Sequence, residues 1–232
     1  MSVAAKICGL STEAAVSAAI AGGAAYLGFV FYPPSPRAVT AAKAARLCVA
    51  VPPGLSRVGL FVDADDDTIG AVLAEVPIDI LQFHGQESPE RVAGARLRFA
   101  RPVMKAVAIA APEDVLVAAR YEEVADFLLF DAKPPRRTNA LPGGNGLAFD
   151  WELIAGRSWR VPWMLSGGLT AELLPEAVRI SGAAAVDVSS GVESRPGVKD
   201  VEKIRAFLAA ARALQDAPSR AGKPYTWPPV AR

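Results

Sequence analysis

The sequence contains little histidine and little cysteine. One histidine and two cysteines are present among 232 residues, too few to supply the four ligands of a structural zinc site, so we expect no metal. Cys8 and Cys48 form the only possible disulfide pair, which disfavours a secreted scaffold held by disulfides and favours a reducing cytoplasm. The 25 basic residues are scattered and the net charge is +1. Because nucleic acids bind to concentrated basic surfaces, we expect no nucleic-acid partner.

Charged residues are also absent from Ala14 to Tyr32, a stretch long enough for a membrane span. The stretch is rich in alanine and glycine, which gain little from lipid, and Gly22-Gly23 divides it. The first part is typical of a helix that begins at Ser11-Thr12-Glu13, and the second part, from Tyr26 to Phe31, is typical of a strand. We therefore expect neither a membrane span nor a signal peptide.

Short β-branched or aromatic runs alternate with alanine-rich helical stretches. We predict strands over Val3–Cys8, Tyr26–Val30, Val58–Val62, Ile78–Phe83, Val103–Val107, Phe127–Asp131, Trp163–Ser166 and Ala184–Ser189. This alternation indicates parallel strands joined by helices, and eight such units in 232 residues are the size of a single (β/α)8 TIM barrel. An open doubly wound sheet is the alternative, but Cys8-Gly9-Leu10-Ser11 lacks the G-x-G-x-x-G loop that typically follows its first strand.

The helical stretches begin at recognisable caps. Ser88-Pro89-Glu90 places a hydroxyl at the N-cap, and Thr40 precedes a helix that must end before Pro52-Pro53. Pro112-Glu113-Asp114 and Thr170-Ala171-Glu172 are predicted to begin two more helices. We assign residues 1–216 to one barrel domain and residues 217–232, which contain four prolines, to an extended or disordered tail.

Polar side chains recur toward the ends of the predicted strands. Alternate residues of a strand share a face, and the carboxyl ends of the strands of a barrel surround one site. Helix-covered parallel strands are normally apolar throughout, so the recurrence favours a shared functional site. The residues concerned are Lys6, Cys8, Gln82, His84, Lys105, Asp131, Asp187 and Ser189.

Glycine-rich turns follow the last strands. Ser166-Gly167-Gly168 follows the seventh strand, Ser189-Ser190-Gly191 follows the eighth, and residues 142–146 form a third such loop between strands six and seven. Glycine lets backbone N–H groups approach an anion closely, and the loops after strands seven and eight are the usual phosphate site of this fold. The sequence therefore predicts a small phosphorylated ligand.

Several ordered motifs run through the chain. They include Lys6-Ile7-Cys8-Gly9-Leu10, Gly28-Phe29-Val30-Phe31-Tyr32-Pro33, Ser35-Pro36-Arg37, Leu81-Gln82-Phe83-His84-Gly85, Phe130-Asp131, Leu165-Ser166-Gly167-Gly168-Leu169 and Asp187-Val188-Ser189-Ser190-Gly191-Val192-Glu193. With these motifs the sequence from about residue 3 to 214 resembles the phosphoribosylanthranilate isomerases of tryptophan biosynthesis. Phe83 departs from the leucine that is frequent in the family, and the residues beyond Asp216 resemble nothing in it.

The resemblance implies an Amadori rearrangement of N-(5-phosphoribosyl)anthranilate to 1-(2-carboxyphenylamino)-1-deoxyribulose 5-phosphate, with no cofactor. It implies that Asp131 is the general acid for the furanose ring oxygen and that Cys8 is the general base for the C2′ proton. It also implies that Arg37 contacts the anthranilate end and that His84 and Asp187 line the substrate pocket. The implied phosphate-binding residues are Gly144, Asn145, Gly146, Gly167, Gly168, Ser190 and Gly191.

Some residues also have a structural interpretation. We interpret Cys48 as a buried apolar side chain. The cluster Asp63, Asp65, Asp66 and Asp67 is interpreted as a solvated loop and helix start rather than as a metal site. Because a free thiol ionises near pH 8.5 and so provides little thiolate at neutral pH, we expect the surroundings of Cys8 to lower its pKa, with Lys6 as the candidate source of positive charge.

Three other functions are less well supported. Ribulose-phosphate epimerase barrels use several metal-binding histidines, whereas this chain has one. Indole-3-glycerol-phosphate synthase barrels have a longer segment before the first strand, whereas Val3 already begins the first predicted strand here. A catalytically inactive barrel that senses a phosphorylated ligand is the alternative from a different class, and fold alone does not choose among these. The sequence does not indicate an oligomeric state, and a monomer is the simplest expectation.

Overall fold

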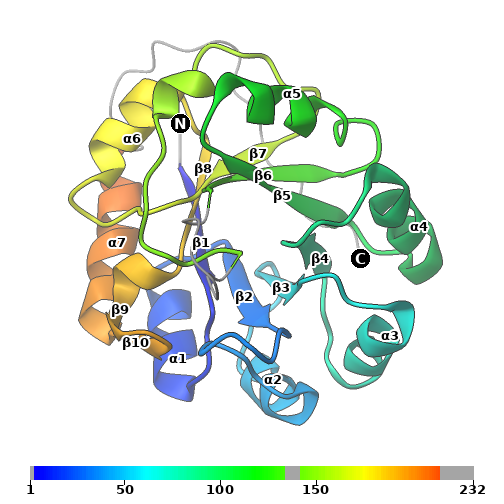
Figure 1. Ribbon diagram of the computed structural model, residues 1–232. Helices are drawn as coiled ribbons and strands as arrows, with labels where there is room; N and C mark the ends of the chain where they lie inside the picture. The colour runs from blue at the N-terminus through cyan, green and yellow to red at the C-terminus, as the bar shows by residue number, and fades with distance from the viewer. Residues whose placement is uncertain (1–2, 134–141, 215–232) are drawn as a thin grey trace.

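Strands and helices alternate along the chain as the sequence predicts. The computed structural model describes residues 3–133 and 142–214. Eight parallel strands close into a barrel in the order β1 to β8 (Figure 1), and pairing of β1 with β8 from Ala4–Ala185 to Ile7–Val188 completes the closure. The strands are β1 Ala4–Cys8, β2 Tyr26–Val30, β3 Ser56–Phe61, β4 Ile80–Phe83, β5 Val103–Ile109, β6 Phe127–Ala132, β7 Trp163–Leu165 and β8 Ala185–Val188. The predicted (β/α)8 barrel is confirmed.

Helices cover the outside of the barrel (Figure 1). They are α1 Glu13–Ala21, α2 Ala41–Cys48, α3 Asp66–Glu75, α4 Pro89–Phe99, α5 Pro112–Ala119, α6 Leu174–Ser181 and α7 Val201–Ala213. In the described part of the β6–β7 connection, the helical element is the short 3-10 helix η1, Trp151–Leu153. After β8, η2 (Ser190–Val192) leads into an antiparallel hairpin of β9 (Glu193–Arg195) and β10 (Val198–Lys199), which strand–helix alternation does not predict.

The predicted caps begin most of these helices. The hydroxyls of Thr12, Thr40 and Ser88 each accept a hydrogen bond from the backbone N–H three residues on. The helix predicted from Thr170 is the exception, because α6 begins at Leu174. Thr170 Oγ1 accepts from Leu173 N–H within a turn, and Pro175, which lacks an N–H, suits the first turn of the helix that follows.

The alternation of side chains decides which residues enter the barrel. Met104 and Ala106 of β5 belong to the apolar cluster inside it. Lys105 lies between them and faces the helices, where its Nζ is 2.7 Å from Glu87 Oε2 and 5.6 Å from the Tyr121 ring centroid. The prediction that Lys105 joins the other polar residues in one site is therefore wrong, since a shift of one residue along a strand reverses the face.

The uncharged stretch from Ala14 to Tyr32 divides between α1 and β2, as predicted. In residues 3–133 and 142–214, no helix combines the length and apolar character needed to cross a membrane. The predicted tail, residues 217–232, lies outside the described residues.

Candidate active site

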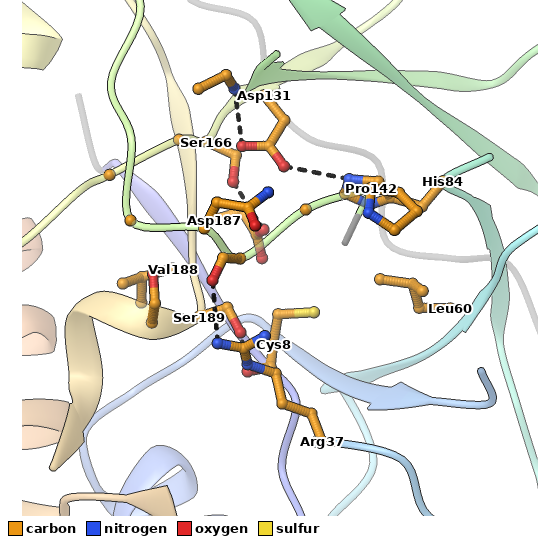
Figure 2. A pocket seen from close by; sticks show the side chains of 18 of the residues that line it. Cys8, Arg37, Leu60, His84, Asp131, Pro142, Ser166, Asp187, Val188 and Ser189 are labelled. Carbon is orange, nitrogen blue, oxygen red and sulfur yellow. Dashed lines mark hydrogen bonds and ion pairs between the residues drawn. The ribbon is translucent and has the colours of Figure 1, made fainter. Parts of the chain in front are cut away.

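A single pocket brings the predicted site residues together. It opens at the carboxyl ends of the barrel strands, and the empty space in it, open solvent at the mouth included, is about 720 Å³. Figure 2 shows Cys8, His84, Asp131 and Asp187 around it, with Arg37 at one side. All twelve residues named from the resemblance line this pocket, namely Cys8, Arg37, His84, Asp131, Gly144, Asn145, Gly146, Gly167, Gly168, Asp187, Ser190 and Gly191.

Cys8 is the last residue of β1 and is almost fully buried. Burial raises the pKa of its thiol, and the nearby charge of Asp187 acts in the same direction. Lys6 and Lys199 act in the opposite direction but do not outweigh burial. The expectation of a lowered pKa is therefore wrong for the ligand-free pocket, because the free energy needed to remove a thiolate from water exceeds its stabilisation by the two lysines.

Lys6 has a carboxylate partner inside the barrel. Its Nζ lies 2.9 Å from Asp187 Oδ1, and both side chains are buried. Ser166 Oγ lies 3.1 Å from Asp187 Oδ2, so both carboxylate oxygens have a partner. Burial alone would lower the pKa of Lys6, but the charges of Asp187 and Cys8 raise it above its ordinary value. Lys6 is therefore a fixed positive charge between strands β1 and β8.

Asp131 lies one residue before the end of β6 and is buried. Its Oδ1 accepts a hydrogen bond of 2.8 Å from Ala132 N–H, and its Oδ2 lies 3.1 Å from His84 Nε2. The other ring nitrogen of His84 lies 3.0 Å from Gln82 Nε2. His84 thus links Gln82 to Asp131 through its two ring nitrogens.

Arg37 is buried at the edge of the pocket, in the loop after β2. Its Nε and Nη2 lie 2.8 and 2.9 Å from the two carboxylate oxygens of Glu193, and Nη2 also donates to Gly144 O at 3.1 Å. Glu193 ended one of the sequence motifs, but no role was predicted for it. A buried arginine needs such a partner, because an unpaired charge in the interior is costly.

The three glycine-rich loops converge on one side of the pocket. A Cβ at Gly168, where φ is +63°, would lie 2.7 Å from the carbonyl carbon of Leu147. A Cβ at Gly191 would overlap the backbone of Leu169. The loops after β7 and β8 and the loop before η1 therefore pack backbone against backbone, and at these two positions a side chain would force them apart.

The pocket also has an apolar wall, which the sequence motifs do not indicate. Val30 and Leu60 form a small cluster with Cys8, and Tyr32 and Val62 pack against it. All four side chains line the pocket. Val30 and Tyr32 are two residues apart at the end of β2, and Leu60 and Val62 are two residues apart at the end of β3. Alternate residues of a strand share a face, so this spacing was the signal available for finding them.

The aspartates after β3 do not form a metal site. Asp65 Oδ1 caps α3 by accepting from Thr68 N–H at 2.8 Å, and Asp63 Oδ1 accepts from Gln86 N–H at 2.6 Å. The interpretation of this cluster as a loop and helix start is confirmed. Across the described ranges, no group of three or more histidine, cysteine or acidic side chains is arranged to hold a metal ion.

The fold and the pocket define a class of protein. A closed parallel barrel that gathers a carboxyl group, a thiol and three glycine-rich loops at the carboxyl ends of its strands is a (β/α)8-barrel enzyme for phosphorylated substrates. A sequence profile described as N-(5'phosphoribosyl)anthranilate (PRA) isomerase matches residues 5–210. The chain therefore belongs to the N-(5'-phosphoribosyl)anthranilate isomerase family.

Individual relatives agree with this membership. The N-(5'-phosphoribosyl)anthranilate isomerase of Cereibacter sphaeroides is 59% identical over 207 residues, which are 89% of this chain and 97% of that protein. That of Paramagnetospirillum magneticum is 56% identical over 212 residues, 91% of this chain and 98% of the relative. These similarities favour the isomerase over the synthase and epimerase alternatives.

Solved structures of the family share the fold. The crystal structure of phosphoribosyl anthranilate isomerase from Thermotoga maritima matches with a TM-score of 0.82 and 37% identity, over 91% of this chain and 99% of that chain. Another structure of the enzyme, in complex with reduced 1-(o-carboxyphenylamino)-1-deoxyribulose 5-phosphate, matches with a TM-score of 0.79 and 34% identity over the same shares.

Proposed function

We propose that the protein catalyses the isomerisation for which its family is named, the Amadori rearrangement of N-(5-phosphoribosyl)anthranilate to 1-(2-carboxyphenylamino)-1-deoxyribulose 5-phosphate in tryptophan biosynthesis. The reaction opens the furanose ring and moves hydrogen from C2′ to C1′. Oxidation at C2′ balances reduction at C1′, so no redox equivalent is consumed. The chemistry requires an acid at the ring oxygen and a base at C2′.

Asp131 is the general acid in this proposal. It donates a proton to the ring oxygen as the bond from C1′ to that oxygen breaks, and the lone pair of the anthranilate nitrogen forms the C1′=N bond of a Schiff base. The Ala132 N–H contacts Oδ1 and His84 Nε2 lies beside Oδ2, so both carboxyl oxygens have a fixed neighbour. His84 orients the carboxyl group through that contact.

Cys8 is the general base. Its thiolate removes the C2′ proton, the C–H electron pair forms the C1′=C2′ bond of an enolamine, and the C=N pair returns to nitrogen. Tautomerisation then adds a proton at C1′ while the C2′ hydroxyl loses one, which gives the ketone. Lys6 and Lys199 supply the positive charge that favours the thiolate.

The two ends of the substrate have separate surroundings in the pocket. We assign the phosphate to the converging backbone of residues 144–146, Gly167-Gly168 and Ser190-Gly191. The anthranilate ring packs on the apolar wall of Val30 and Leu60, and its carboxylate binds Arg37. Asp187, already bound to Lys6 and Ser166, lines the pocket between these two ends.

The observation that carries the proposal is that Cys8 and Asp131, from strands β1 and β6, line the same pocket. The test is loss of the fluorescence of phosphoribosylanthranilate with the parent protein, Cys8→Ser and Asp131→Asn. Cys48→Ser is the matched control, because Cys48 is buried in α2 away from the pocket and burial raises the pKa of its thiol to about 11. Turnover by the parent and by Cys48→Ser, but not by the two site variants, supports the proposal, whereas no turnover by the parent overturns it.

The same proposal includes a cytoplasmic monomer whose partner is the small-molecule substrate. Both cysteines are free thiols, as suits a reducing compartment. The most exposed large apolar side chains of the described residues, Val49, Leu97 and Leu116, lie after α2, on α4 and on α5, and scattered apolar residues do not require a partner. Sedimentation equilibrium should give one species near 24.3 kDa.

A further inference from the structure

Glu193 is buried at the start of β9, beside the pocket rather than in its lining. Its carboxylate binds four groups: Nε and Nη2 of Arg37, Nζ of Lys199 at 2.8 Å, and the N–H of Gly197 at 3.2 Å. Burial alone would raise the pKa of Glu193, but the hydrogen bonds and charges of Arg37 and Lys199 outweigh it and lower the pKa. Glu193 is therefore a buried anion held between two cations.

The geometry of the pair determines what Arg37 can still bind. A guanidinium group has five N–H donors in a planar fork. Glu193 takes the edge formed by Nε and Nη2, and Gly144 O accepts a second bond from Nη2. Nη1, with two N–H groups, is the nitrogen outside these bonds. Gly144 packs against this end, since a Cβ there would lie 2.5 Å from Nη1, and Glu193 decides the direction in which the end points.

The β9–β10 hairpin holds Glu193 against the loop that carries Arg37. Gly197, at the turn of the hairpin, packs so closely on this loop that a Cβ would overlap the Pro36 carbonyl oxygen. Lys199 on β10 binds Glu193 and also donates to Ser189 O at 2.8 Å. Ser189 Oγ in turn donates to Cys8 O at 3.2 Å. The hairpin thus joins the Arg37 loop to the end of β1.

The charges of the cluster also suit an anionic ligand. Arg37 carries one positive charge and Glu193 one negative charge. Burial lowers the pKa of Lys199 although Glu193 opposes this, and protonated Lys199 adds a second positive charge, which favours an anion that reaches Arg37 from the pocket. Because the partners of Glu193 are buried with it, the ion pair is little screened by water.

We propose that Glu193 is a positioning residue that makes the site selective for a substrate with an aryl carboxylate, by holding the Arg37 guanidinium in one orientation. This inference rests on the proposed contact between Arg37 and the anthranilate carboxylate. Glu193 itself touches no reacting atom. Its removal leaves the charge of Arg37 in place but frees its orientation, so recognition of the carboxylate weakens while the contacts of the rest of the ligand persist.

The test compares two ligands that differ only in the carboxylate. Calorimetric titration gives the Kd of reduced 1-(o-carboxyphenylamino)-1-deoxyribulose 5-phosphate and of its phenylamino counterpart without the carboxylate. Selectivity is the Kd of the ligand without the carboxylate divided by the Kd of the ligand with it. A general loss of packing raises both Kd values together and leaves this ratio unchanged. In Glu193→Gln the ratio should fall by about tenfold or more, and Glu193→Asp, which keeps a carboxylate on a shorter side chain, should recover part of it.

Asp79→Asn is the matched control. Asp79 binds Arg57 through the same bidentate geometry, with Nε at 2.8 Å and Nη2 at 3.0 Å, but at the amino-terminal ends of β3 and β4. The ratio of the two Kd values in Asp79→Asn should equal that of the parent. In Arg37→Ala the ratio should fall, and adding Glu193→Gln to that variant should change it no further, because the two residues act as one unit.

The outcomes separate two kinds of failure. An unchanged ratio in Arg37→Ala overturns the proposed contact with the carboxylate. A lowered ratio in Arg37→Ala together with an unchanged ratio in Glu193→Gln overturns the role of Glu193 alone. If Glu193→Gln does not fold, Glu193→Ala is measured in its place, and a parent-like ratio in that variant overturns the proposal.

Discussion

His84 Nε2 lies 3.1 Å from Asp131 Oδ2, although the two residues are 47 positions apart and belong to the ends of β4 and β6. Gly143 covers this contact, because a Cβ at that position would lie 2.6 Å from His84 Nε2 and 2.7 Å from Asp131 Oδ2. The pair is thus enclosed by the loop that also contributes to the proposed phosphate site. This enclosure gives the carboxyl group one orientation toward the pocket.

Replacement of the proposed acid should affect the chemical step most. Asp131→Asn keeps an acceptor for Ala132 N–H but cannot donate the same proton, so kcat should fall about 10²–10⁴-fold. His84→Asn retains the acid and loses its orienting contact, so its kcat should fall less. Steady-state fluorescence kinetics with both variants check this order. A larger loss in His84→Asn than in Asp131→Asn would contradict the assignment of the acid.

The pH profile should report the ionisation of Cys8. Because the base is the thiolate and burial raises the thiol pKa, kcat/KM should increase with pH along an acidic limb that lies above the ordinary thiol value of about 8.5. Cys8→Ser should abolish the limb together with most of the activity. Measurement of kcat/KM against pH in the parent gives its position, and a limb that persists at the same pH in Cys8→Ser would show that another group is the base.

Removal of the Lys6 charge should move the same limb to higher pH. Lys6 lowers the pKa of Cys8, so Lys6→Met leaves the thiol harder to ionise. The substitution also leaves Asp187 buried without its partner, at a cost of about 3–5 kcal/mol in the free energy of unfolding, so circular dichroism must first confirm that the variant folds. If the acidic limb of folded Lys6→Met lies at the same pH as that of the parent, Lys6 stabilises the barrel but does not lower the pKa of Cys8.

Loss of Arg37 should leave the substrate carboxylate without its partner. In Arg37→Ala, kcat/KM for phosphoribosylanthranilate should fall by the equivalent of about 2–5 kcal/mol, as for an interfacial charge left unpaired. The aniline analogue without the carboxylate should react equally with variant and parent. Arg57→Ala removes an arginine from an ion pair of similar geometry that is partly exposed and lies outside the pocket, and it controls for loss of an arginine elsewhere in the barrel. Equal losses on both substrates would assign Arg37 a purely structural role.

The phosphate loops offer a pair of glycines with similar backbone geometry. Gly168 and Gly182 have φ of +63° and +73°, so alanine strains both by about 1–2 kcal/mol. A Cβ at Gly168 also meets the Leu147 backbone, whereas one at Gly182 meets nothing within 4 Å. Only Gly168→Ala should therefore raise KM and weaken inhibition by inorganic phosphate. Parallel increases in KM for the two variants would remove the loop after β7 from the proposed site.

Local chemistry made much of this protein predictable from its sequence. The alternation of strand and helix, the caps at Thr12, Thr40 and Ser88, and the glycine-rich turns each depend on neighbouring residues. The eight-stranded barrel follows from them by counting. The pocket residues, including Cys8 and Asp131, were located by motif and by position at strand ends. Such features are encoded within a few residues of one another, so they can be identified in the chain before it folds.

Closure of the barrel decided what these local features leave open. The direction of Lys105 depends on the register of β5, which places its side chain toward Glu87 and away from the pocket. The pairs Lys6–Asp187 and Arg37–Glu193 join residues 181 and 156 positions apart. The raised pKa of Cys8 depends on how deeply the closed barrel buries it. Register, long-range pairing and burial arise only when the strands assemble, and the ionisation and orientation of the site therefore belong to the tertiary structure.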